Sequence, residues 1–157
     1  LFHKYPDAKA FAAADFAELG EVIHSTGFFN AKARHIIGAC SAIAERHGGE
    51  VPRTLDALVA LPGVGRKTAN VVLNIAFGEP TIAVDTHIFR IGNRTGLAPG
   101  KTPEEVERGL LRRAPQEFMQ HAHHWLILHG RYVCKARNPE CQRCVVADLC
   151  GFKGKTL

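Results

Sequence analysis

The sequence predicts an all-α protein. Apolar residues recur at helical spacing along most of the chain, capping residues and glycines bound these stretches, and no alternating strand pattern extends beyond Thr81–Val84. The chain has 157 residues, of which 46% are hydrophobic and 22% are charged, so it can bury a core and is not a disordered tail. This length suits one domain or two small lobes.

The first third of the chain is expected to form three helices. Asp7–Ala14 and Phe16–His24 are short and carry apolar residues mainly on one side. A longer helix has Asn30 as its N-cap and runs to about His47, because its apolar positions keep helical spacing and two glycines follow it.

The middle of the chain has the pattern of a helix-hairpin-helix over residues 54–77. Thr54 can cap a short helix over Leu55–Ala60, and a second helix covers Arg66–Phe77. Between the two, a run rich in glycine turns the chain sharply.

Three further helices are expected toward the C-terminus. Asp85 or the residue after it caps the first, which ends near Gly96, and the second begins at Thr102-Pro103, where a cap precedes proline and two acidic residues. The last long helix covers Pro115–Val133, and a loop with cysteines follows. We therefore expect a helical domain over residues 1–114 and a second part, 115–157, made of the last helix and the cysteine loop.

Charge favours a polyanionic partner, and hydropathy gives no sign of a membrane segment. The formal net charge is +5 and the pI is about 9.1, which favours nucleic acid, although many ordinary basic proteins have similar values. No apolar run approaches the length of a membrane helix, and the first residues lack the pattern of an export signal.

The turn of the hairpin has the composition of a phosphate-binding loop. Gly63, Val64 and Gly65 place two glycines one residue apart, which allows positive φ and close approach, so that backbone N–H groups can face a phosphate. Arg66 adds positive charge where a DNA backbone would lie. Taken alone, Gly-x-Gly is also the composition of a purely structural turn.

Two residues are candidates for catalysis. Lys67 is either a phosphate-contacting cation or a nucleophile, and an amine attacks carbon only when it is neutral, a form that the helix N-terminus and Arg66 both favour. Asp85 is either an N-cap alone or a cap that also stabilises positive charge developing on a sugar ring. The two roles of Asp85 are compatible, because a capping carboxylate is held ionised and fixed in orientation.

Four of the five cysteines lie together near the C-terminus with the spacing C-x6-C-x2-C-x5-C. Because nothing directs export, clustered thiols indicate metal ligands before disulfides. Zinc sites usually have two close cysteine pairs, whereas four thiolates around one point suit a 4Fe-4S cluster, and a structural zinc remains the alternative. The four are Cys134, Cys141, Cys144 and Cys150.

Three basic residues lie within the cysteine loop. Lys135, Arg137 and Arg143 either contact DNA phosphates or form a solvated face that offsets the negative cluster. Cys40 stands apart on an apolar helix stripe and is expected to be a small buried side chain.

Several of these segments together resemble the bacterial endonuclease III family of DNA glycosylases. They are the hairpin with its following helix over residues 61–73, Val84–His87, His123–Arg131 and the four-cysteine spacing. The resemblance covers essentially the whole chain. It implies a bifunctional DNA glycosylase and abasic-site lyase for base excision repair of oxidised pyrimidines.

The resemblance also implies roles for particular residues. In that family, the lysine matching Lys67 attacks C1′ of a flipped nucleotide and forms a Schiff base, and β-elimination then breaks the strand. The aspartate matching Asp85 helps to activate the lysine and stabilises the cationic sugar. The four clustered cysteines match the ligands of a 4Fe-4S cluster with a mainly structural role. Phe28 aligns with a segment that wedges into the DNA stack, and the alternative is a core phenylalanine.

The implied partner is double-stranded DNA with damaged pyrimidines or abasic sites, bound by a monomer associated with the nucleoid in the bacterial cytoplasm. The family's N-terminal helices would precede Leu1, so we expect exposed apolar faces, weak stability and low glycosylase activity for these residues alone. Related adenine glycosylases are one alternative, but they place a small hydroxyl residue where Lys67 stands. A non-catalytic DNA-binding iron-sulfur module is the other.

Overall fold

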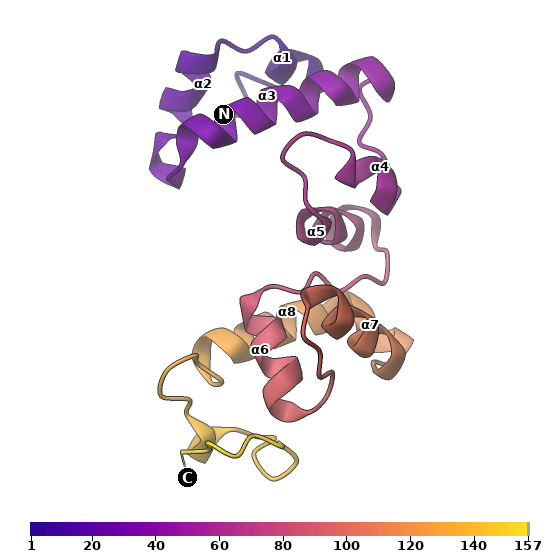
Figure 1. Ribbon diagram of the computed structural model, residues 1–157. Coiled ribbons are helices and arrows are strands. Elements are labelled where there is room, and N and C mark those ends of the chain that lie inside the picture. Colours follow the sequence, from indigo (N-terminus) through magenta and orange to yellow (C-terminus); the bar gives the residue numbers. More distant parts are fainter. Residues whose placement is uncertain (157) are drawn as a thin grey trace. The chain divides into compact units, whose positions relative to one another are not determined.

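A computed structural model describes residues 1–156, and all regular secondary structure in that range is helical (Figure 1). The predicted all-α class is therefore confirmed. The chain forms two compact units, Leu1–Ala69 and Asn70 onward, and the boundary lies inside α5 (Arg66–Phe77). The expected division between residues 114 and 115 falls inside the second unit, where α8 packs against α6.

The first unit is built around one long helix. Helices α1 and α2 pack against α3, and side-chain caps start each of the short helices, with Asp7 accepting from Ala10 N at 2.8 Å and Asp15 accepting from Glu18 N at 2.9 Å. The elements are α1 (Ala8–Ala12), α2 (Phe16–Val22), the 3-10 helix η1 (His24–Thr26), α3 (Phe29–Arg46) and α4 (Leu55–Val59).

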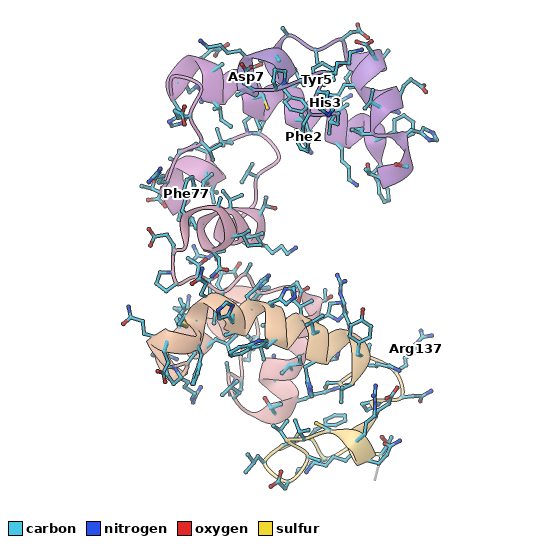
Figure 2. The ribbon with its side chains drawn as sticks, turned by 180° about the vertical axis from the view of Figure 1, so that it is seen from behind. Phe2, His3, Tyr5, Asp7, Phe77 and Arg137 are labelled. Atoms are coloured by element: carbon cyan, nitrogen blue, oxygen red, sulfur yellow. The ribbon has the colours of Figure 1, made fainter. Side chains whose placement is uncertain are left out.

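The core of the first unit joins the N-terminal residues to α2 and α3. Leu19 and Ala33 are fully buried and pack with Tyr5 and Ile23. The Tyr5 ring lies 5.0 Å from the Phe11 ring, centroid to centroid, which anchors the chain start on α1. Figure 2 labels Tyr5 beside Phe2 and His3 in this part of the chain. Burial of these side chains holds α3 in place under the hairpin that follows it.

The second unit packs α6 (Thr86–Thr95) against α7 (Pro103–Arg113) and α8 (Gln116–Tyr132), and a short 3-10 helix η2 (Cys141–Arg143) follows in the cysteine loop. Thr102 caps α7 as predicted, with Pro103 at its first position. The buried core consists of Ile82, Val84, Ile88, Ala98, Val106, Leu110 and Met119.

An extended segment before α6 takes the place of a strand. Residues 82–84 are buried without pairing into a sheet. The Asn74 side chain donates to the carbonyls of Glu79 and Thr81, both at 3.1 Å, and the Thr81 hydroxyl donates to the Asn70 carbonyl at 2.7 Å. These bonds to α5 satisfy backbone groups that a sheet would otherwise pair, and they fix the approach to Asp85.

The start of α3 differs from the sequence prediction. The N-cap is Phe28, not Asn30, and Phe28 has the left-handed conformation with φ 51° and no side-chain capping bond. Asn30 lies inside the first turn instead. The turn through Gly27 and Phe28 sets this start, because consecutive positive φ values redirect the chain out of η1.

None of the described helices is both long enough and apolar enough to cross a membrane.

Candidate active site and cluster site

The hairpin between α4 and α5 is a tight turn supported by α3. The Val64 amide donates to the Leu61 carbonyl at 3.1 Å, and the Ala69 amide donates to the Gly65 carbonyl at 3.0 Å, so Gly65 is the residue from which α5 starts. Gly63 has φ 74°, and a Cβ atom added there would lie 2.4 Å from Cγ of His35 on α3. Both the conformation and the close approach therefore require glycine at position 63.

Of the two glycines that allow positive φ, only Gly63 adopts it, and Gly65 does not. It is absent from the residues with positive φ, and a Cβ atom added there would meet nothing within 4 Å. This position is open and not packed, so its lack of a side chain leaves the start of α5 accessible. The backbone conformation of Gly63 forms the turn, and the missing side chain of Gly65 leaves the outer surface of the turn accessible.

Lys67 lies in the first turn of α5, directly after this turn. Its side chain is exposed, as is that of Arg66. The first amides of a helix have no carbonyl acceptor within it, so they and the positive end of the helix dipole favour an anion at this position. The Lys67 side chain therefore lies beside helix amides that favour an anion.

Asp85 caps α6 in the second unit. One oxygen, Oδ1, accepts from the amides of His87 and Ile88, both at 2.9 Å, and the side chain is half-buried. The capping role predicted from sequence is thus confirmed. The two bonds hold the carboxylate in one orientation, and both are accepted by the same oxygen, Oδ1.

Phe28 is a surface residue, which excludes the core alternative. Its side chain is 90% exposed, although the neighbouring Phe29 is half-buried against His24. A non-glycine residue with φ 51° is strained, and a bare aromatic ring in water has lost its apolar contacts. The wedge role of Phe28 stays a prediction, and the exposed ring is compatible with it.

The four clustered cysteines line one cavity at the end of the second unit. Cys134, Cys141, Cys144 and Cys150 share it with His129 and apolar side chains, and all five cysteines of the chain are free thiols. The Sγ atom of Cys144 is 3.7 Å from Nε2 of His129, and burial lowers the pKa of His129 below its ordinary value. Convergence of four thiols from one loop is the arrangement that a metal centre requires.

Four thiolates can hold either a zinc ion or a 4Fe-4S cluster. Zinc holds each sulfur at about 2.3 Å, so its four ligands must crowd together, whereas a cubane keeps its ligand sulfurs apart by the width of the cluster. The four cysteines that line this cavity supply the all-thiolate ligand set that a 4Fe-4S cluster takes.

Cys40 lies elsewhere, half-buried on α3, and burial raises the pKa of its thiol. It takes no part in the cavity, in agreement with the sequence prediction that separated it from the other four.

The basic residues of the loop differ in their contacts. Lys135 and Arg143 both form ion pairs with Glu140, and their hydrogen bonds hold the pKa of that carboxyl below its usual value. Arg143 also donates to the Tyr132 carbonyl at 2.8 Å. Arg137 is exposed and extends from the loop after α8 (Figure 2). Their contact with DNA stays a prediction.

Two arginines that the sequence analysis overlooked connect α6 to the cysteine loop. Arg90 and Arg94 lie one helical turn apart and donate to carbonyls of residues 130–136. Their spacing on one face of a helix was the only local signal, and it does not reveal partners forty residues away.

The chain matches a family model over most of its length. Residues 1–116 match the HhH-GPD superfamily of base excision DNA repair proteins, and residues 134–150 match the iron-sulfur binding domain of endonuclease III. The chain therefore belongs to the helix-hairpin-helix superfamily of base excision repair proteins, and its iron-sulfur binding domain, which spans the four clustered cysteines, indicates a 4Fe-4S cluster.

Comparison with individual relatives identifies the family to which the chain belongs within this superfamily. The chain is 57% identical over 156 residues to endonuclease III of Escherichia coli K12, covering 96% of this chain and 73% of that protein. It is 58% identical over 137 residues to endonuclease III of Haemophilus influenzae, covering 87% and 65%. The chain is a member of the endonuclease III family.

Solved structures agree with this assignment. The fold is similar to a trapped covalent endonuclease III–DNA intermediate, with a TM-score of 0.88 and 44% identity over 95% of this chain and 70% of that one. It is also similar to a thermostable thymine-DNA glycosylase, with a TM-score of 0.86 and 25% identity over 96% of this chain and 71% of the other.

Proposed function

We propose that this chain binds double-stranded DNA, removes oxidised pyrimidines and cleaves the resulting abasic site, with Lys67 as the nucleophile. The observation that carries the proposal is the position of the Lys67 amine, exposed on the first turn of α5 beside a hairpin whose turn is held tight by Gly63. A phosphate bound at the hairpin would bring the sugar of an extruded nucleotide toward this amine.

Lys67 and Asp85 have separate roles in the proposed reaction. The neutral Lys67 amine attacks the sugar C1′, the bond to the damaged base breaks, and loss of a proton and ring opening leave a Schiff base. β-Elimination then breaks the carbon–oxygen bond on the 3′ side of the sugar. Asp85, fixed by its two backbone bonds, is placed in this scheme to stabilise the positive sugar and to help deprotonate the lysine.

The remaining contacts with DNA are proposed from the exposure and charge of the side chains. Phe28 is the aromatic wedge that would replace the stacking lost when a nucleotide is extruded, since its ring is exposed at the turn between η1 and α3. Gly63, Val64, Gly65 and Arg66 would contact the backbone of the DNA, and Arg137 is the loop cation best exposed for a second phosphate.

The 4Fe-4S cluster, when bound, supplies a covalent link between the four thiols and so orders residues 134–150. Cys134 and its three partners would hold it, and the loop around it positions the basic residues. We further propose that the chain acts as a monomer on the bacterial chromosome, in the nucleoid.

Borohydride trapping on an oligonucleotide with an abasic site tests the nucleophile without depending on the low glycosylase activity expected for these residues. A covalent protein–DNA adduct is expected for the unmodified chain and is lost in Lys67→Gln, whereas Lys67→Arg keeps DNA binding without the adduct. Lys153→Gln, an exposed lysine near the C-terminus, is the matched control and should trap normally. DNA binding with no adduct in the unmodified chain would instead favour the non-catalytic module.

A further inference from the structure

The cysteine loop is hydrogen-bonded to the last turn of α6. Arg94 Nη1 donates to the Lys135 carbonyl at 2.6 Å, and Nη2 donates to the Ala136 carbonyl at 3.0 Å. The same Nη1 lies 3.6 Å from the Cys134 sulfur, within hydrogen-bond range for sulfur. One guanidinium therefore contacts both the first cysteine of the cavity and the backbone that follows it.

Arg90, one turn earlier, anchors the same segment through backbone alone. Its Nε donates to the Cys134 carbonyl at 2.9 Å, and its Nη2 donates to the Gly130 carbonyl at 2.8 Å. These bonds join the end of α8 to α6. The Arg90 guanidinium contacts three backbone carbonyls and the His87 ring but no sulfur, which separates its role from that of Arg94.

The other end of the loop returns to the same turn. The Cys150 thiol lies 3.6 Å from the Arg94 carbonyl, and the Gly151 amide donates to the Thr95 carbonyl at 3.3 Å. The Arg94 guanidinium is also 4.4 Å from the centroid of the Phe152 ring, a cation–π contact. Arg94 thus contacts the first cysteine and Phe152 through its side chain, and the last cysteine through its backbone carbonyl.

This pattern of contacts suits arginine and no other side chain. Only the planar guanidinium offers several fixed donors together with a flat face for stacking, and it stays charged when half-buried. Because its donors are directed into the loop, Arg94 serves the cavity and not the DNA backbone.

We propose that Arg94 is the positioning residue of the cluster: it fixes the Cys134 sulfur and raises the reduction potential of the bound 4Fe-4S centre. A hydrogen bond and a positive charge at a ligand sulfur stabilise the more negative, reduced cluster. Arg90 holds the same loop without this electrical effect. The assignment of the cluster itself does not depend on this role.

The test uses the full chain with its cluster assembled and two readouts, the reduction potential by protein-film voltammetry and the rate at which visible absorbance is lost to an iron chelator. Arg94→Gln should lower the potential and speed cluster loss by about 10-fold or more. Arg90→Gln should speed cluster loss with a smaller change in potential. Arg112→Gln, an exposed arginine on α7, is the control and should match the unmodified chain.

Arg94→Lys separates the effect of the positive charge from that of the guanidinium geometry. It also provides the test if Arg94→Gln assembles no cluster. It retains the charge but loses the fork, so the potential should fall less than in Arg94→Gln while cluster loss is still accelerated. The proposal is overturned if Arg94→Gln has the potential of Arg112→Gln. It is equally overturned if Arg94→Lys releases its cluster at the rate of the unmodified chain.

Discussion

Replacing Gly63 by alanine should destabilise the first unit while replacing Gly65 should not. Alanine at position 63 would have to adopt φ 74°, which costs about 1–2 kcal/mol for a residue with a Cβ atom. The new atom would also lie 2.4 Å from Cγ and 2.5 Å from Cβ of His35. Rotating the His35 side chain cannot relieve the second contact, so α3 or the hairpin must move, at a further cost of about 1–3 kcal/mol.

The combined loss for Gly63→Ala is therefore about 2–5 kcal/mol, measured as the free energy of unfolding in urea followed by circular dichroism. Gly65→Ala meets open space at an ordinary φ, so its free energy of unfolding should change by no more than about 1 kcal/mol. Its effect should appear in DNA affinity, measured by fluorescence anisotropy, because a methyl group would stand where a phosphate approaches. Equal destabilisation by the two substitutions would refute the reasoning.

Three further substitutions, at Asp85 and Phe28, separate effects on stability from effects on catalysis. Asp85→Ala removes the cap of α6 and should lower the free energy of unfolding by about 0.5–2 kcal/mol. Asp85→Asn keeps the capping oxygen, so it should keep the melting temperature while slowing borohydride trapping. A normal trapping rate for Asp85→Asn would contradict the catalytic role. Phe28→Gly removes an exposed ring from a position with φ 51°, so it should stabilise the chain by about 1 kcal/mol or leave it unchanged, and should slow excision from duplex DNA. Unchanged excision by Phe28→Gly would remove the wedge assignment.

Features that depend on neighbouring residues were predictable from the sequence. The caps Thr54, Asp85 and Thr102 and the four-cysteine spacing were identified because each signal lies within a few residues of the structure that it causes. The start of α3 was misplaced, since the left-handed conformation of Phe28 has no signature in a hydrophobic residue.

Features that depend on distant contacts were not predictable. The positive φ of Gly63 and the ordinary φ of Gly65 follow from the packing of His35 against the turn, which a Gly-x-Gly pattern does not contain. The contacts of Arg90 and Arg94 with the cysteine loop link residues more than forty positions apart. Helical spacing placed both side chains on one face but carried no information about what covers that face.

The shared carboxylate of Glu140 has a consequence for salt dependence. Lys135 and Arg143 each carry +1 and Glu140 carries −1, so the three together present a net charge of +1 to a polyanion, not +2. A cation already paired with a carboxylate displaces fewer condensed counterions from a nucleic acid. The slope of log affinity against log salt concentration should therefore be shallower than the number of basic residues on the loop implies. The selectivity of the loop for its DNA then depends more on the shape of the contact surface than on charge.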